Sequence, residues 1–267
     1  MHFAGSVVVP ESVENPLKYY LNNTCRSRAL IEAAVKAEVP HFIFSSTAAT
    51  YGVPAVSAVT EDTPQSPINP YGWSKLMTER MLADTAFAHS FNYCALRYFN
   101  VAGADPQGRS GQSTAGATHL IKVAVEAALG KRGHVSVLGT DYDTPDGTGV
   151  RDYIHVSDLA AAHVLALEAL LAEPARSLTM NCGYGHGYSV LEVLDAVDRV
   201  TNARIERRME GRRAGDPPSL ISDNARIKAT LPWVPQRDDL EAIVRDALQW
   251  ERKLDQIRGF EQPKSKT

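Results

Sequence analysis

The stretch His41-Phe42-Ile43-Phe44-Ser45-Ser46-Thr47 decides the fold class of this chain. It is a short apolar run that ends in polar residues, which is typical of a strand buried on both faces of a parallel sheet. Ligands in open α/β sheets bind beyond the carboxyl ends of the strands, so we expect Ser46 and Thr47 to lie where chemistry takes place. On position alone, both are explained equally well as turn residues.

The helix expected after this strand carries a candidate catalytic pair. Asn69-Pro70 is a helix N-cap followed by a favoured first residue, so we expect a helix from Pro70 to about His89. Tyr71 and Lys75 are four residues apart and share one face of it. Lowering a tyrosine pKa from about 10 to about 7 requires ~4 kcal/mol, whereas an ammonium ~6 Å away supplies ~2.8 kcal/mol. A second positive charge must supply the remaining free energy. A Y-x-x-x-K pattern alone also fits a pair of surface residues on an amphipathic helix.

Strands and helices alternate around this region, which favours a parallel sheet with right-handed crossovers. From Gly103 on, the alternation is less regular. We therefore predict an α/β fold: a Rossmann-like doubly wound parallel sheet, N-terminally incomplete, in residues 1–102, and a smaller α/β substrate domain mainly in 103–260, some of whose segments can return to the sheet. Residues 261–267 are a polar tail. The expected elements are helices 15–37, 118–129, 158–172 and 240–257, and strands 93–98, 135–138, 151–156 and 178–182.

Composition excludes several classes of function. The chain has 267 residues, 44% of them hydrophobic, and a net charge of −3, so it forms a substantial core and offers no broad basic surface to nucleic acid. The first residues are not a basic region followed by a long apolar run, so we expect no secretion signal, and we expect no stretch that spans a membrane. Cys25, Cys94 and Cys182 are scattered and read as reduced core residues without a metal signature. We expect a soluble, cytoplasmic protein with no metal site and no nucleic-acid or membrane partner.

A glycine-rich loop at Gly183-Tyr184-Gly185-His186-Gly187 invites comparison with a phosphate-binding loop. It lacks the complete G-x-G-x-x-G pattern and the acidic residue that follows it in a dinucleotide-binding unit. Ser189 and Glu192 instead have the spacing of a capping box. We favour a plain helix start here over a dinucleotide site.

Several motifs together resemble the UDP-glucose 4-epimerase family, a group of extended short-chain dehydrogenase/reductases. The Y-x-x-x-K pair alone indicates only the wider superfamily, whereas the run from Asp146 to Val156 is specific to the epimerase branch. The similarity extends from Met1 to about Trp250. The motifs are His2–Gly5, Phe42–Thr47, Tyr51-Gly52, Tyr71–Lys75, Leu96–Asn100 and Asp146–Val156.

The resemblance implies an NAD-dependent interconversion of UDP-glucose and UDP-galactose. Tyr71 takes the proton of the sugar 4-hydroxyl, Lys75 lowers the tyrosine pKa and holds the nicotinamide ribose, and Thr47 bridges the hydroxyl and the tyrosine. Hydride passes from C4 to NAD, the 4-keto sugar turns over, and hydride returns to its other face. The family also implies a homodimer formed through the helices within residues 17–37 and 75–89.

The resemblance also assigns binding residues. Asn100 contacts the diphosphate, Arg151 and Arg213 bind phosphate oxygens, and Asp216 accepts from the uridine ribose. His119 stands where some members have an asparagine near the phosphates, and Leu220 stands where side-chain size influences acceptance of N-acetylated sugars. The implied NAD-binding residues are Phe3, Ala4, Gly5, Asn22, Ser45, Tyr71, Lys75 and Tyr98. The implied substrate-binding residues are Thr47, Asn100, His119, Leu120, Arg151, Tyr153, Arg213 and Asp216.

The chain departs from the family in its N-terminal region. The family's first strand, glycine-rich loop and acidic ribose-binding residue have no counterpart before Met1, and Val7 replaces a lysine often found near the cofactor. An inactive or cofactor-less fragment that binds a UDP-sugar, or only a partner chain, is therefore an alternative hypothesis. A dehydratase or decarboxylase of the same superfamily is another, although Ala48-Ala49 offers no side chain that could shuttle a proton.

Overall fold

Three parallel strands form the central sheet. The computed structural model describes residues 1–56, 58–114, 116–173, 175–213 and 216–259. The strand order is β1 (His41–Thr47), β3 (Asn92–Tyr98), β8 (Leu178–Cys182), with Thr47 opposite Tyr98 and Tyr98 opposite Cys182. Every residue of β1 after His41 is buried, as its apolar sequence predicts. On the outer side of β1, His2 forms a parallel bridge with Phe44.

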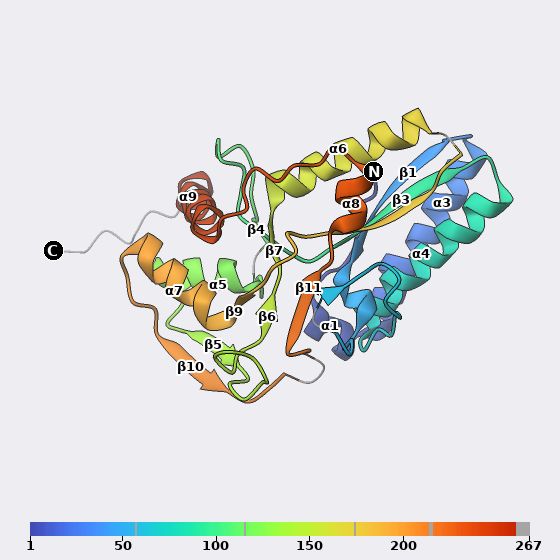
Figure 1. Cartoon of the computed structure of the whole chain (residues 1–267). Coiled ribbons are helices and arrows are strands. Elements are labelled where there is room, and N and C mark those ends of the chain that lie inside the picture. Colours follow the sequence, from blue (N-terminus) through green and yellow to red (C-terminus); the bar gives the residue numbers. More distant parts are fainter. Residues whose placement is uncertain (57, 115, 174, 214–215, 260–267) are drawn as a thin grey trace.

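Helices cover both faces of this sheet (Figure 1). One face carries α4 (Pro70–Ala88) with the helical run α1 (Val9–Glu14), α2 (Pro16–Tyr19), the π-helical turn η1 (Tyr20–Cys25) and α3 (Arg26–Lys36). The other face carries α6 (Val156–Ala172). This three-layer arrangement is the predicted Rossmann-like fold.

The remaining elements form a second region beside the central sheet. Helices α5 (Leu120–Ala128), α7 (Val190–Thr201) and α9 (Leu240–Arg258) pack on one another. Short strand pairs flank them: β4 (Asn100–Ala102) with β7 (Tyr153–His155), and β5 (Val135–Leu138) with β10 (Arg207–Glu210). The last sheet has the order β2 (Ala58–Val59), β11 (Ser219–Ser222), β6 (Val150–Arg151), β9 (Tyr188–Ser189). The 3₁₀ turn η2 (Ala48–Tyr51) and α8 (Ala225–Thr230) complete the described elements.

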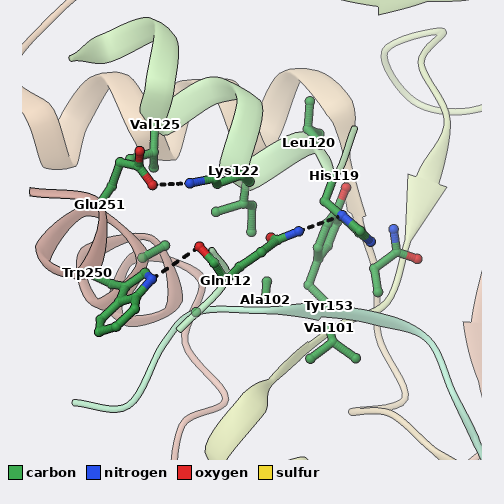
Figure 2. A pocket seen from close by; sticks show the side chains of 14 residues that line it. Val101, Ala102, Gln112, His119, Leu120, Lys122, Val125, Tyr153, Trp250 and Glu251 are labelled. Carbon is green, nitrogen blue, oxygen red and sulfur yellow. Dashed lines mark hydrogen bonds and ion pairs between the residues drawn. The ribbon is translucent and has the colours of Figure 1, made fainter. Parts of the chain in front are cut away.

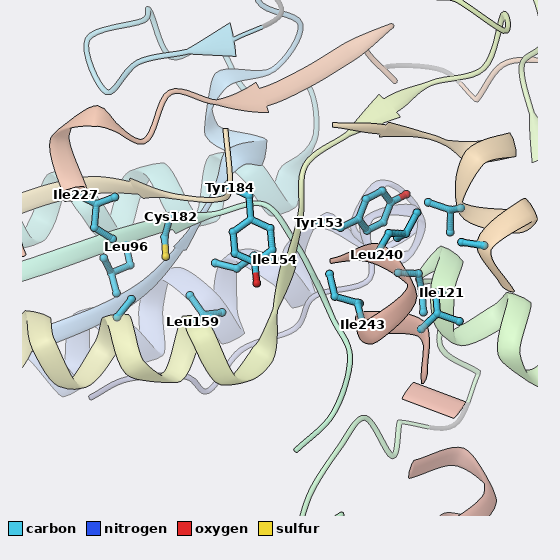
Figure 3. Packing of buried hydrophobic residues seen from close by; sticks show 14 of the residues in the cluster. Leu96, Ile121, Tyr153, Ile154, Leu159, Cys182, Tyr184, Ile227, Leu240 and Ile243 are labelled. Atoms are coloured by element: carbon cyan, nitrogen blue, oxygen red, sulfur yellow. The ribbon is translucent and has the colours of Figure 1, made fainter. Parts of the chain in front are cut away.

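One hydrophobic core runs through both regions (Figure 3). Ile154 lies between the residues that pack against the sheet, such as Leu96 and Leu159, and those of the second region, such as Ile121 and Ile243. Strand β8 and helix α6 belong to the sheet although they follow residue 103. The division into 1–102 and 103–260 stays a prediction, and the expected tail at 261–267 lies outside the described residues.

Most elements begin and end within two residues of where the sequence predicts, but the expected strand 151–156 is divided into β6 and β7, which belong to different sheets. The expected helix 15–37 contains the π-helical turn η1, and α6 begins two residues early, at Val156, because His155 acts as its N-cap and accepts from Ser157 N at 3.0 Å. The expectation that all three cysteines are core residues is wrong for Cys25, which is exposed. Among the described helices, none is long and apolar enough to cross a membrane.

Candidate active site

A cleft opens beyond the carboxyl ends of β1 and β3, where the sequence predicted the chemistry. It consists of two adjoining cavities of about 330 Å³ and 280 Å³. Asn100, His119 and Arg151 line both cavities. The predicted site residues that line the cleft are Phe3, Ser45, Thr47, Tyr71, Lys75, Tyr98, Asn100, His119, Leu120, Arg151, Tyr153, Arg213 and Asp216. Ala4, Gly5 and Asn22 are not among the described lining residues.

The first turn of α4 places Tyr71 in the cleft. Asn69 caps the helix and accepts from Gly72 N at 2.9 Å, which confirms the predicted cap. A side chain at residue 72 would bring a Cβ to 2.6 Å from the Ala49 carbonyl oxygen, so only glycine lets α4 approach η2 this closely. That approach brings the Tyr71 hydroxyl into a hydrogen bond with Thr47.

Burial dominates the ionisation of Tyr71 and Lys75. It raises the pKa of Tyr71 above the usual tyrosine range, and the hydrogen bond with Thr47 opposes this rise. It also lowers the pKa of Lys75 from 10.5 to about 8. The expected lowering of the Tyr71 pKa therefore does not arise in the protein alone. A positively charged ligand next to the phenol would stabilise the phenolate and so lower the pKa of Tyr71, which Lys75 alone does not do.

Lys75 has free capacity to bind a ligand. Its side chain is buried, and its ammonium donates to the Ser45 carbonyl at 2.9 Å and lies 5.0 Å from the centroid of the Phe44 ring. Among the described residues, no carboxylate pairs with it. An ammonium has three N–H donors, so two remain for hydroxyl groups such as those of a ribose. The donor set of the cleft thus fits a nicotinamide nucleotide.

A buried histidine whose Nδ1 bonds to the Leu159 carbonyl at 2.8 Å packs against two aromatic rings that line the cleft. The His163 ring on α6 is 4.9 Å from the Phe3 ring and 6.2 Å from the Tyr98 ring, between centroids. The Tyr98 hydroxyl is hydrogen-bonded to the Ser45 hydroxyl. His163 Nε2 is buried without a hydrogen-bond partner in the described structure. Its position in an Ala/Leu-rich helix carries no sequence signal of a role near the cleft.

Asn23, next to the predicted cofactor-binding residue Asn22, is the buried asparagine of η1. Its side chain accepts from Ser6 N at 2.8 Å and donates to Ser6 O at 2.9 Å and to the Ser74 hydroxyl at 3.0 Å. Asn22 is partly exposed and donates to the Ser6 hydroxyl at 2.9 Å. Asn23 therefore ties the N-terminal loop to α4.

The second cavity has the charges expected of an anion site. Arg151 donates to the Val150 carbonyl at 2.8 Å and forms no ion pair with any described residue. Burial lowers its pKa, and Asp216 opposes this effect. Arg213 and Asp216 bind each other through two bonds of 3.0 and 2.9 Å. In the protein alone, the two residues expected to bind phosphate and ribose are thus paired together, whereas Arg151 is available to a ligand.

A buried ion pair supports the cleft from behind. Arg97 on β3 and Glu79 on α4 are joined by bonds of 2.7 to 3.1 Å, and both side chains are buried. Ser46 donates to Glu79, and Arg97 donates to the Tyr51 hydroxyl at 3.0 Å. Ser46 therefore fixes the end of β1 and does not line the cleft. The only sequence signal of this network was the charged residue Arg97 within the otherwise apolar strand β3.

The glycine-rich loop at 183–187 holds an internal carboxylate, which rules out its interpretation as a phosphate loop. Asp152 is fully buried and accepts from Tyr184 N at 2.9 Å, Gly185 N at 3.1 Å and the Ser222 hydroxyl at 2.7 Å. A Cβ at Gly183 would lie 2.5 Å from the same carboxylate. The predicted capping box of Ser189 is confirmed.

The fold and the site define a Rossmann-type enzyme with a tyrosine–lysine pair at the carboxyl edge of its sheet. A family model described as the NAD dependent epimerase/dehydratase family matches residues 1–183. The chain belongs to this family.

Its similar relatives narrow the class further. The UDP-glucose 4-epimerase of Azospirillum brasilense is 57% identical over 97% of this chain and 74% of its own length. The structure of UDP-glucose 4-epimerase from Brucella ovis in complex with NAD gives a TM-score of 0.89 at 47% identity, covering 93% of this chain and 76% of that one. The enzyme from Bifidobacterium longum, in complex with NAD⁺ and UDP, gives 0.88 at 39% identity, covering 94% and 75%.

Proposed function

We infer that this chain interconverts UDP-glucose and UDP-galactose with NAD as its cofactor. The observation that supports this most strongly is that Thr47, Tyr71 and Lys75 lie in one cleft with the available guanidinium of Arg151. The relatives at 57% and 47% identity are both named UDP-glucose 4-epimerase. Ala48 lines the cleft at the position where a dehydratase needs an acidic side chain. We therefore disfavour the alternative that the chain is a dehydratase.

The chain's own residues divide the chemistry among them. Tyr71 accepts the proton of the sugar 4-hydroxyl, and Thr47 aligns that hydroxyl through its hydrogen bond with the phenol. Lys75 donates to ribose hydroxyls with the N–H groups that the Ser45 carbonyl leaves free. Bound NAD would supply the hydride acceptor and donor for C4 of the sugar, and a positive charge that favours the phenolate form of Tyr71.

Substrate binding depends mainly on the nucleotide. Arg151 binds the diphosphate together with Asn100, and guanidinium groups suit phosphate oxygens. Arg213 and Asp216 turn from each other to the phosphate and the uridine ribose. His119, Leu120 and Tyr153 line the uridine side. The hexose has to turn over between the two hydride transfers, so a site that holds the UDP tightly and the sugar loosely suits the reaction.

We also propose a homodimer and a cytoplasmic location. Leu17 and Leu21 on the α2–η1 run and Trp73 and Met77 on α4 are exposed by 40 to 78%, and the two helical segments lie against each other. A second copy would cover this surface. Light scattering of the chain and of Leu17→Glu tests the dimer, because a charge there should yield monomers. A monomeric mass for the unaltered chain would refute it.

The activity is tested with the purified chain, NAD and UDP-galactose. We expect UDP-glucose to appear, and Tyr71→Phe to reduce its rate by roughly 10²–10⁴-fold, the usual contribution of a general base. Tyr93→Phe, at the opposite end of β3, is the matched control and should keep the rate. Absence of both product and reduced nicotinamide, with folded protein, would favour the cofactor-less UDP-sugar-binding alternative.

A further inference from the structure

His119 lies at the junction of three cavities. It lines both cavities of the cleft and a third one of about 30 Å³, room for one water molecule, shown in Figure 2. It precedes α5, but its side chain does not cap that helix. Its Nδ1 instead meets Gln112 Nε2 at 2.9 Å. An amide N–H donates, so Nδ1 accepts, and in this assignment the neutral ring carries its proton on Nε2.

Helix α9 fixes the partner of this histidine. Trp250 donates from its indole nitrogen to the Gln112 carbonyl at 3.1 Å. A Cβ at Gly111 would lie 2.4 Å from the same indole ring, so the loop packs directly on it. The Gln112 amide is therefore held next to His119, and Figure 2 shows the second ring nitrogen of His119 on the side away from Gln112. Nε2 forms no hydrogen bond with any described residue.

The charges around the ring leave it without an acidic partner. The titratable groups that line the same cleft cavity are Tyr142, Arg151, Tyr153, Arg213 and Asp216. Asp216 is already paired with Arg213. From α5 and α9, Lys122 and Glu251 line the small cavity and pair with each other. The protein around the ring lowers the pKa of His119, so the imidazole is neutral at neutral pH before a ligand binds.

We propose that His119 donates its Nε2–H to the diphosphate of the UDP-sugar, and that binding is coupled to the uptake of a proton from solvent at Nδ1. The proposal rests on the proposed function. A diphosphate beside the ring favours the imidazolium form. The glutamine can accommodate the second proton by turning its amide, so that Oε1 accepts from Nδ1–H.

The sign of the pH dependence follows from linkage. A ligand that raises the imidazole pKa binds more tightly to the protonated protein. The resulting gain in affinity is complete below the pKa of the free protein, and it is lost as the pH rises through the pKa of the complex. A rise of about one pKa unit corresponds to roughly tenfold tighter binding below this window.

Titration calorimetry without NAD tests the coupling apart from catalysis. UDP-glucose is the probe, because the terminal phosphate of free UDP itself titrates near pH ~6. The chain is titrated at about pH 6.5, close to the ordinary histidine pKa, in two buffers with different ionisation enthalpies. We expect uptake of a substantial fraction of one proton. His119→Asn should bind UDP-glucose with no uptake, and Gln112→Glu, whose carboxylate keeps the imidazolium in the free protein, should bind with little uptake. His89→Asn, at an exposed histidine after α4, should behave as the unaltered chain.

The possible failures are distinguishable. UDP-glucose binding with no proton uptake, or with equal uptake in His119→Asn, overturns this inference and leaves the proposed function standing. No binding of UDP-glucose to the folded chain overturns both. NMR titration of the His119 ring with and without UDP-glucose gives the same answer without a variant, because an unchanged imidazole pKa would contradict the coupling.

Discussion

Replacing Lys75 by methionine should make the protein more stable and abolish its activity. The pKa of Lys75 falls from 10.5 to about 8 on folding, which corresponds to roughly 3 kcal/mol of destabilisation carried by the ammonium at neutral pH. Methionine has a similar unbranched shape and no charge. It leaves the Ser45 carbonyl without its donor at a cost of about 1–2 kcal/mol. We expect a net gain of roughly 1–2 kcal/mol at neutral pH.

The pH dependence separates this explanation from ordinary repacking. The unfolded chain binds more protons at Lys75 than the folded one between about pH 8 and 10.5, so the native protein gains stability as the pH rises through this window. The variant lacks that gain, and its advantage should disappear at the alkaline end. Urea unfolding at neutral and alkaline pH measures both effects. A Lys75→Met protein that is less stable than the native chain at neutral pH would refute the reasoning, as would an advantage that does not depend on pH.

Three further changes test the scaffold by denaturant unfolding. Arg97→Met leaves the carboxylate of Glu79 buried and unpaired and should cost about 3–5 kcal/mol, and adding Glu79→Gln should recover part of this loss; an equally unstable double variant would contradict the pairing. Gly183→Ala places a Cβ 2.5 Å from a carboxylate oxygen and should cost about 2–3 kcal/mol, whereas Gly133→Ala, with open space around it, should change stability by about 0.5 kcal/mol or less. Ser189→Ala removes the capping box and should cost about 1 kcal/mol, and no change would show that the cap is redundant.

Local signals in the sequence predicted much of the scaffold. Asn69-Pro70 marked the start of α4, Ser189 marked the start of α7, and the apolar run 135–138 is the strand β5 with the same bounds. These features depend on residues close together in the chain, where capping chemistry and hydrophobic patterning act. The location of the cleft followed from the rule for parallel sheets, because β1 was recognisable as a buried strand.

Features that depend on tertiary surroundings could not be predicted in this way. In a medium of moderate dielectric, the ammonium of Lys75 would lower the pKa of Tyr71, as predicted from the sequence. The cleft buries both groups, so desolvation raises one pKa and lowers the other. Likewise, the pairing of Arg213 with Asp216 and the unpartnered Nε2 of His163 depend on which elements meet in space.

The run from Asp146 to Val156 shows why a family-specific motif is not a list of ligand contacts. Arg151, at the end of β6, lines the cleft, whereas Asp152, between β6 and β7, is buried in the core. Asp152 is held by backbone and hydroxyl donors from two separate segments. Because that anchor fixes the strand, the neighbouring guanidinium is held in the cleft before any ligand arrives. We therefore expect the proposed phosphate binding to depend on both residues, with Arg151 making the contact and Asp152 holding the strand in place.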